Sequence, residues 1–217
     1  MSNVFDSKIM RVRLTFVEPL LGTAAADPAI HETYIASKAP DAKTMAEEIE
    51  AIGEDGVREK GQTVFPRHPE TGEPILFAYQ IRGFFKSACG ALREIAGTES
   101  KKVKAYKKKI DRLITVWVDA RDRVSKTKHM IEIQNHGVVG DCQRPLRAST
   151  PQGERVAIAD SEEVQAGAYV EFDIECLNPS DEKLVREWLS YGIYNGLGQW
   201  RNSGKGAFTW EEIDRLS

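Results

Sequence analysis

The sequence predicts an α+β fold in which helices cover one face of an antiparallel sheet. Two segments, Met10–Phe16 and Gly167–Cys176, alternate between apolar and polar residues, as half-buried strands do. Two others, Ala78–Ala96 and Glu182–Tyr194, place apolar residues at helical spacing. The order of strand, helix, several strands, helix and strand fits a ferredoxin-like (RRM-like) βαββαβ core with insertions.

Between the first strand and the first strong helix, the chain is rich in loop signals. Gly22–Asp41 carries small residues and two prolines, which predicts a loop, and Ala42–Ile52 is a short helix candidate closed by Gly53. Thr63–Pro74 is punctuated by prolines and a glycine and is expected to be a loop or a hairpin. We therefore assign residues 23–74 to an insertion or loop region.

The second half of the chain supplies the remaining strands. Leu113–Asp119 is rich in β-branched residues, and Met130–Gln134 and Arg155–Ile158 are shorter candidates. Ala207–Ile213 is expected to be the last strand of the sheet. Residues 98–155 are assigned to a basic insertion or hairpin region.

The composition is that of one folded domain spanning residues 1–217. The chain is 41% hydrophobic and 29% charged, which is enough to build a packed core. No apolar run approaches the roughly 20 residues that cross a bilayer, and the first residues lack the basic and then apolar pattern of a signal peptide. We therefore expect a cytoplasmic protein with no membrane partner.

The chain offers no residue set typical of a metal or disulfide site. Cys89, Cys142 and Cys176 are far apart and form no CxxC pair. Adjacent acidic pairs such as Glu162 and Glu163 point in different directions along a strand or helix, so they cannot readily chelate one ion. We expect free thiols, no metal and no cofactor.

Basic residues concentrate in one part of an acidic chain. The formal net charge is −3, but residues 101–155 hold 14 Lys and Arg against 6 Asp and Glu. A local basic surface can attract a phosphate backbone even when the whole protein is acidic. For the lysine-rich stretch 101–109, a solvated helix face is an equally good interpretation.

A second group of basic residues follows the predicted strand Leu113–Asp119 at nearly alternate positions. On a hairpin these residues would form a ridge suited to a single-stranded backbone, although a solvated hairpin is the alternative. The group consists of Arg121, Arg123, Lys126 and Lys128.

A glycine-rich loop, Asn195–Gly206, separates the last predicted helix from the last predicted strand. Glycine permits positive φ and close approach of the backbone to a ligand, so successive N–H groups can form an anion-binding nest. Trp200 either stacks on a base or fills the core. A helix cap followed by a hairpin is the alternative to phosphate contact. The candidate contacts are Gly198, Arg201, Asn202, Ser203, Gly204 and Lys205.

Three segments together resemble the RAMP superfamily. Gly196–Phe208 resembles its glycine-rich loop, and Tyr79–Arg93 looks like its first helix, with Ile81-Arg82-Gly83 followed by Leu92-Arg93. Arg144–Ala148 and the residues up to Ile174 are similar to the segment before the last helix in backbone subunits of type III CRISPR effector complexes. The chain also resembles stand-alone relatives encoded by phages or mobile elements.

The resemblance implies an RNA-binding subunit without catalysis of its own. Its partners would be single-stranded RNA, either guide or target, together with copies of itself or other effector subunits. Further candidate contacts are Arg82 and Lys86 on the first helix and Arg144 and Arg147 in the basic stretch.

Two other functions remain open at this point. An endoribonuclease would use His31, because histidine titrates near neutral pH, or Asp27, whose loop corresponds to the one that carries a target-cleaving aspartate in type III backbones. Alternatively, because a fold does not fix a function, a phage-encoded counter-defence module would bind a nucleotide or an effector protein.

Overall fold

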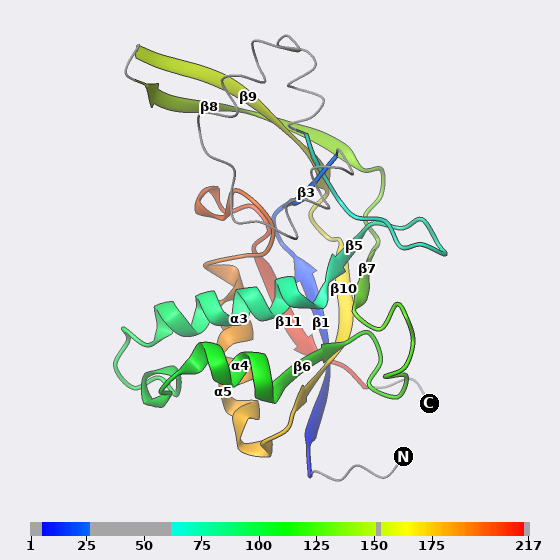
Figure 1. Ribbon diagram of the computed structural model, residues 1–217, viewed down its shortest axis with the longest axis vertical. Coiled ribbons are helices and arrows are strands. Elements are labelled where there is room, and N and C mark those ends of the chain that lie inside the picture. Colours follow the sequence, from blue (N-terminus) through cyan, green and yellow to red (C-terminus); the bar gives the residue numbers. More distant parts are fainter. Residues whose placement is uncertain (1–5, 27–61, 151–152, 215–217) are drawn as a thin grey trace.

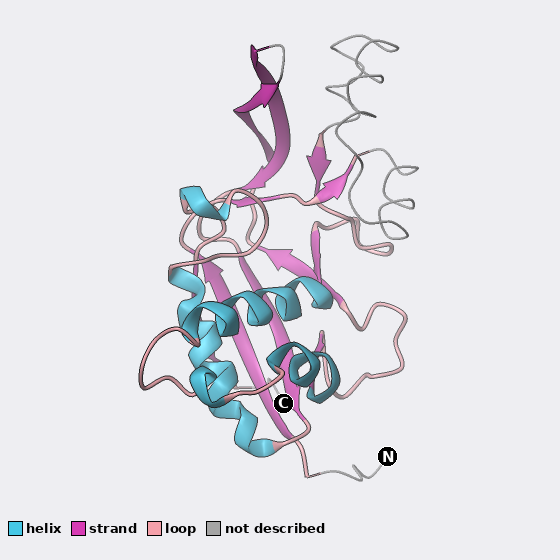
Figure 2. Cartoon of the chain, turned by 60° about the vertical axis from the view of Figure 1, so that its left-hand side comes forward, coloured by secondary structure: helices cyan, strands magenta, loops and turns pink. Residues whose placement is uncertain are grey.

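The computed structural model describes residues 6–26, 62–150 and 153–214. In this part of the chain the predicted α+β fold is confirmed, with antiparallel sheets and helices packed on one face of the larger sheet (Figures 1 and 2). The helix candidate Ala42–Ile52 lies outside the described residues.

The larger sheet has the strand order of a ferredoxin-like core. Its centre is β1 (Lys8–Phe16), which is antiparallel to β10 (Tyr169–Cys176) on one side and to β11 (Phe208–Glu212) on the other. Beyond β10 lie β6 (Ile114–Trp117) and β7 (Met130–Gln134), which together occupy the position of the second core strand. The order across the sheet is therefore β11, the last core strand, then β1, the first, then β10, the third, and then β6 and β7. A short strand, β5 (Ile75–Phe77), pairs with β7 at the edge.

The prediction of a hairpin around Arg121–Lys128 is wrong. β6 pairs with the end of β10 and β7 with its start, so the two lie one after the other along β10 rather than against each other. The intervening loop is fastened to buried acids of β10: the Ala120 N–H donates to Asp173 at 2.6 Å, and Arg123 pairs with Glu175 at 3.0 Å. These two acids draw the loop towards the sheet.

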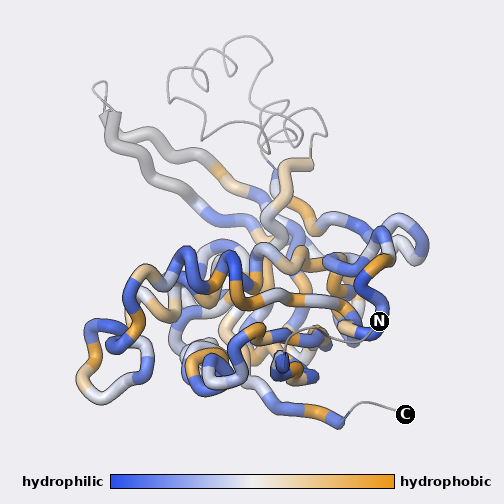
Figure 3. Tube along the Cα trace, turned by 60° about the horizontal axis from the view of Figure 1, so that its bottom comes forward, coloured by the Kyte–Doolittle hydropathy of each residue, from blue (hydrophilic) through white to orange (hydrophobic). Residues whose placement is uncertain are grey.

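The sheet is covered by α3 (Ala78–Leu92) and α5 (Glu182–Ser190). At the start of α3, Gln80 accepts a hydrogen bond from the Phe77 N–H at 2.7 Å. Within α3 and α5 the apolar residues at helical spacing are buried, and the rings of Phe85 and Trp188 approach to 5.6 Å between the helices. Ile95 and Ile193 lie beyond the ends of these helices, which are shorter than predicted, and both are exposed. Hydrophobic and hydrophilic residues alternate along the elements (Figure 3), which gives each of them one core-facing side.

Between α3 and β6 lie a 3-10 helix, η1 (Ser100–Lys102), and α4 (Tyr106–Leu113). Glu187 of α5 holds the start of η1 by accepting hydrogen bonds from the backbone N–H groups of Glu99 and Ser100. The basic region therefore contains a helix of its own, fastened to the core helices.

A long hairpin of β8 (Gly140–Thr150) and β9 (Gly153–Val164) projects from the core (Figure 1). The sequence predicted only a short strand within β9, at 155–158. Alternation gives a weak signal here, because the outer part of a projecting hairpin has no core to cover.

The base of this hairpin belongs to a second, smaller sheet. There β9 pairs with β2 (Leu20–Leu21) and with β4 (Thr63–Val64), and β4 pairs with β3 (Ala24–Ala25). The predicted insertion 23–74 thus contributes the short strands β3 and β4, one on each side of residues 27–61, which lie outside the described part of the chain.

The last core helix is shorter than predicted. A 3-10 turn, η2 (Pro179–Asp181), leads into α5, which ends at Ser190, and η3 (Tyr191–Ile193) follows. Gly192 packs so closely on β11 that a Cβ there would lie 2.3 Å from the Phe208 ring.

The glycine-rich loop contains one short 3-10 turn, η4 (Arg201–Ser203), and closes on itself through two glycines. A Cβ on Gly196 would lie 2.1 Å from the carbonyl carbon of Gly206, and a Cβ on Gly206 would lie 2.0 Å from the Leu197 carbonyl oxygen. Gly206 also has φ +72°, which favours glycine. Both positions are therefore fixed by packing within the loop, as the alternative of a cap and hairpin predicted.

We expect Gly206→Ala to lower the free energy of unfolding by about 3 kcal/mol, because it adds a steric clash to an unfavourable φ. Gly204→Ala is the matched control: Gly204 also has positive φ, +91°, but open space around its Cβ position, so about 1 kcal/mol is expected. Urea unfolding followed by tryptophan fluorescence measures both. Equal losses would contradict the role given to the close contact.

Candidate nucleic-acid interface

A groove of about 650 Å³ lies along the glycine-rich loop and the end of the last core helix. Its residues come from one continuous stretch of chain that folds back on itself, and we call it the aromatic groove. The groove is lined by Tyr191, Tyr194, Asn195, Gly198, Gln199, Trp200, Arg201 and Asn202.

Aromatic side chains give the groove its apolar surfaces. Tyr194 is 79% exposed and Trp200 is 39% exposed, which is unusual for residues of this size. The rings of Tyr191 and Tyr194 lie 5.9 Å apart. Exposed rings beside a backbone-binding site are the platforms on which unpaired bases stack.

Arg144, on β8, connects the projecting hairpin to the groove. Its guanidinium lies over the Trp200 ring, 5.4 Å from the ring centroid, and Nη2 donates to Gln199 Oε1 at 2.6 Å. The side chain is only 8% exposed, and its Nη1 has no hydrogen-bond partner. An arginine fixed in this way holds Trp200 in place and adds positive charge to the wall of the groove.

The loop's own cations occupy different environments. Arg201 is exposed and lines the groove, and in the described part of the chain it has no ion-pair partner. Lys205 points away towards β9, where its Nζ lies 2.7 Å from Glu163 Oε2 and both side chains are mostly covered. Of the two loop cations that the sequence predicted as contacts, Arg201 therefore lines the groove and Lys205 does not.

The outer face of the large sheet is covered by ion pairs. Arg13 lies 2.6 Å from Glu171, and Arg11 lies 3.5 Å from both Glu171 and Asp173. The hydrogen bond from Arg13 to Glu171 raises the pKa of this guanidinium, because it favours the charged form. An RRM uses aromatic residues on the same face to stack bases, but here charged pairs of opposite sign neutralise one another.

No protein-family model matches the chain, and no curated protein sequence does. Among solved structures, one match is a chain from the cryo-EM structure of the type III-B Cmr-beta bound to cognate target RNA. The two chains share a fold. The TM-score is 0.50 and 11% of residues are identical; the match covers 96% of this chain and 59% of the other, so this chain spans less than two thirds of that chain's length.

Other predicted contacts lie outside the groove. Lys86 on α3 pairs with Asp111 at 2.6 Å, and Arg82 is half-buried on the same helix. Arg147 lies on β8, among residues whose side chains are outside the description. Neither Arg82 nor Lys86 belongs to the described lining of the groove.

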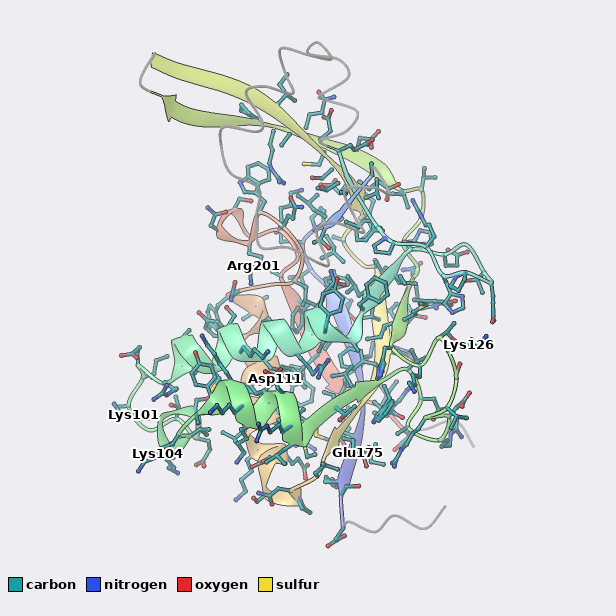
Figure 4. The ribbon with its side chains drawn as sticks, in the orientation of Figure 1. Lys101, Lys104, Asp111, Lys126, Glu175 and Arg201 are labelled. Atoms are coloured by element: carbon teal, nitrogen blue, oxygen red, sulfur yellow. The ribbon has the colours of Figure 1, made fainter. Side chains whose placement is uncertain are left out.

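The loop between β6 and β7 is separate from the groove as well. Figure 4 shows Lys126 and Arg201 on different sides of the molecule. Arg121 pairs with Asp119 at 2.7 Å, whereas Lys126 is exposed and Lys128 is half-buried. The structure thus divides the predicted contacts between two regions.

The catalytic candidates Asp27 and His31 lie outside the described residues. The other three histidines have partners: His136 Nε2 lies 2.6 Å from Glu73, His68 Nδ1 lies 3.6 Å from Glu132, and His129 Nδ1 lies 2.9 Å from the Val116 carbonyl oxygen. Each histidine thus fastens one segment to another.

The described residues contain no group of three or more His, Cys, Asp or Glu side chains that could hold a metal ion. The three cysteines are free, and burial raises the pKa of the Cys176 thiol to about 12, so it is protonated at neutral pH.

No helix among residues 6–26, 62–150 and 153–214 is both long and apolar enough to span a bilayer.

Sequence reasoning included Gly198, Arg201, Asn202 and Arg144 but missed Tyr191, Tyr194, Asn195 and Gln199. The sequence predicts a helix that continues to Tyr194, whereas α5 ends at Ser190. Two tyrosines three residues apart, directly before a glycine-rich loop, were the available signal. Asn195 also binds the loop to α3, since its Nδ2 donates to Ser87 Oγ at 2.9 Å.

We expect Lys205→Gln to lower the free energy of unfolding by about 1 to 2 kcal/mol, because it leaves the mostly covered Glu163 without its cation. Arg201→Gln should change it by less than about 0.5 kcal/mol, since Arg201 is exposed and unpaired among the described residues. Urea unfolding at neutral pH compares the two. If Arg201→Gln were less stable than Lys205→Gln, it would be wrong that Lys205, rather than Arg201, stabilises the fold.

Proposed function

We propose that the chain is a RAMP-type, RNA-binding subunit of a CRISPR-like effector or a related ribonucleoprotein, and that the aromatic groove holds single-stranded RNA. The observation that carries the proposal is the groove itself, in which exposed aromatic rings, amide groups and the unpaired Arg201 line one surface. The shared fold with a chain from an RNA-bound type III-B structure supports it.

The chemistry of the groove suits unpaired nucleotides. Tyr194 and Trp200 offer ring faces to bases, and stacking tolerates any base sequence. Asn202 and Gln199 supply amide groups for base edges or sugars, although Gln199 Oε1 is already held by Arg144. Arg201 supplies the positive charge that a phosphate requires.

The groove favours single-stranded over double-stranded RNA. The bases of a duplex stack on each other and cannot also stack on Tyr194 or Trp200 without being unpaired. On the outer face of the sheet, Arg11 and Arg13 are engaged by Glu171 and Asp173. The Tyr169 ring on that face is engaged as well, since the Arg13 guanidinium lies 4.7 Å from its centroid. RNA contact is therefore assigned to the loop side.

We expect Trp200→Ala and Tyr194→Ala each to weaken binding of single-stranded RNA by about 1 to 3 kcal/mol, as loss of one stacked base does. This corresponds to roughly 5-fold to 150-fold in Kd. Fluorescence anisotropy with a labelled, unstructured RNA at fixed salt measures the change. Trp200→Phe keeps a ring and should retain most of the affinity.

Tyr79→Ala is the matched control, because Tyr79 is 58% exposed but lies on α3 outside the groove. It should bind RNA as the parent chain does. A duplex of the same length should bind more weakly than the single strand. If Trp200→Ala and Tyr194→Ala bound single-stranded RNA like the parent, the groove would not be the RNA site.

A further inference from the structure

A second basic surface lies apart from the aromatic groove. It consists of four exposed lysines from η1, α4 and the turn between them, and we call it the lysine patch: Lys101, Lys104, Lys107 and Lys108. Figure 4 shows Lys101 and Lys104 at an end of the molecule distant from Arg201. In the described part of the chain, none of the four has an ion-pair partner.

The neighbouring acids are engaged elsewhere and do not neutralise the patch. Asp181, almost fully buried, lies 2.7 Å from Lys109, and Asp111 lies 2.6 Å from Lys86. Glu99 is taken by Lys102 at 2.6 Å. These pairs fasten the segment to the core and leave the four patch lysines directed outwards.

This arrangement has an electrostatic cost that an anionic partner would offset. The chain has more acidic than basic residues, 33 against 30, yet it gathers unpaired lysines on one surface. Lys107 and Lys108 lie in the first turn of α4, where the positive end of the helix dipole disfavours cations. Mutual repulsion among the four charges adds to this cost.

The type of side chain indicates which anion fits. Lysine carries a compact charge on a flexible stem and suits a phosphate backbone read without base contacts. Protein interfaces, by contrast, are depleted in lysine and depend on buried Trp, Tyr and Arg. Beside the patch lies a hollow of about 380 Å³, and Lys104 belongs to its lining. Two acids of the hollow, Glu99 and Asp181, are paired with lysines of the same lining, Lys102 and Lys109. Lys183 is a further cation of the lining.

The patch and the groove lie near opposite ends of α5. The hollow includes the first residues of α5, up to Leu184, and the groove begins at Tyr191, just after its end. The helix has nine residues and is therefore about 14 Å long. A nucleic-acid strand that leaves the groove can reach the patch by following this side of the molecule.

We propose that an RNA strand whose bases occupy the aromatic groove continues along α5, so that its phosphates lie on the lysine patch without sequence preference. This inference rests on the RNA-binding function proposed for the groove. On this proposal, the patch determines how long a stretch of RNA is bound and how strongly binding depends on salt, and it takes no part in base stacking.

The test uses the full chain and two single-stranded RNAs, one of about four and one of about 20 nucleotides, which bracket known site sizes. The variant replaces Lys101, Lys104, Lys107 and Lys108 with Gln, and the matched control replaces the same four residues with Arg. Kd is measured against salt concentration by anisotropy or competition. For the long RNA, the Gln variant should bind about 10-fold to 100-fold more weakly, with a log–log salt slope smaller by about 0.7 for each lost phosphate contact.

The Arg control should keep the slope for the long RNA, and neither variant should change binding of the short RNA. The proposal is overturned if the Gln variant binds the long RNA with the Kd of the parent, which is the result expected of a patch that binds an acidic protein. It is also overturned if the Gln variant loses affinity for both RNAs equally. A third contrary result is a loss of affinity for the long RNA in the Arg control as large as that in the Gln variant. Trp200→Ala in the same assay separates the two proposals. A loss of affinity with Trp200→Ala but not with the Gln variant removes only the patch. A loss with the Gln variant but not with Trp200→Ala removes the groove as the RNA site, and with it the proposed path from the groove to the patch.

Discussion

The close contact between the backbones of Gly196 and Gly206 positions the loop on which the candidate site depends. The Leu197 N–H donates to the Gly206 carbonyl oxygen at 3.0 Å, and the Gly206 N–H donates to the Pro19 carbonyl oxygen at 2.8 Å. Because Pro19 lies between β1 and β2, the hydrogen bond from the Gly206 N–H to the Pro19 carbonyl oxygen holds the loop against strands of both sheets. A side chain at either glycine would separate these backbones and displace the rings on both sides of the groove.

Arg144 gives the groove a second constraint, which originates in the other sheet. Burying a guanidinium is costly unless it gains contacts, and here it gains the Trp200 ring and Gln199 while one nitrogen lacks a partner. The side chain thereby couples the projecting β8–β9 hairpin to the glycine-rich loop. The smaller sheet meets the glycine-rich loop at this wall of the groove, so the shape of the wall depends on how the hairpin leaves the core.

The sequence determined the core more clearly than the site. Alternation predicted β1 and β10, and helical spacing predicted α3, because burial on one face leaves a periodic pattern. The path of the 118–129 loop could not be predicted, since it depends on Asp173 and Glu175, which are distant in sequence and whose burial is visible only in the fold. Likewise, the spacing of the loop cations does not reveal that Lys205 pairs with Glu163, whereas Arg201 has no ion-pair partner among residues 6–26, 62–150 and 153–214.

The distribution of charge explains why the proposed RNA site lies on the loop side rather than on the open sheet. On the sheet, the cations Arg11 and Arg13 and the acids Glu171 and Asp173 lie on neighbouring strands and pair across them, so little net field remains. On the helix side, the acids serve to fasten segments to the core, and lysines without partners remain at the surface. A chain that is acidic overall thus directs its positive field to one side. The packing of Gly196 and Gly206 within the glycine-rich loop places Trp200 and Arg201 on that side.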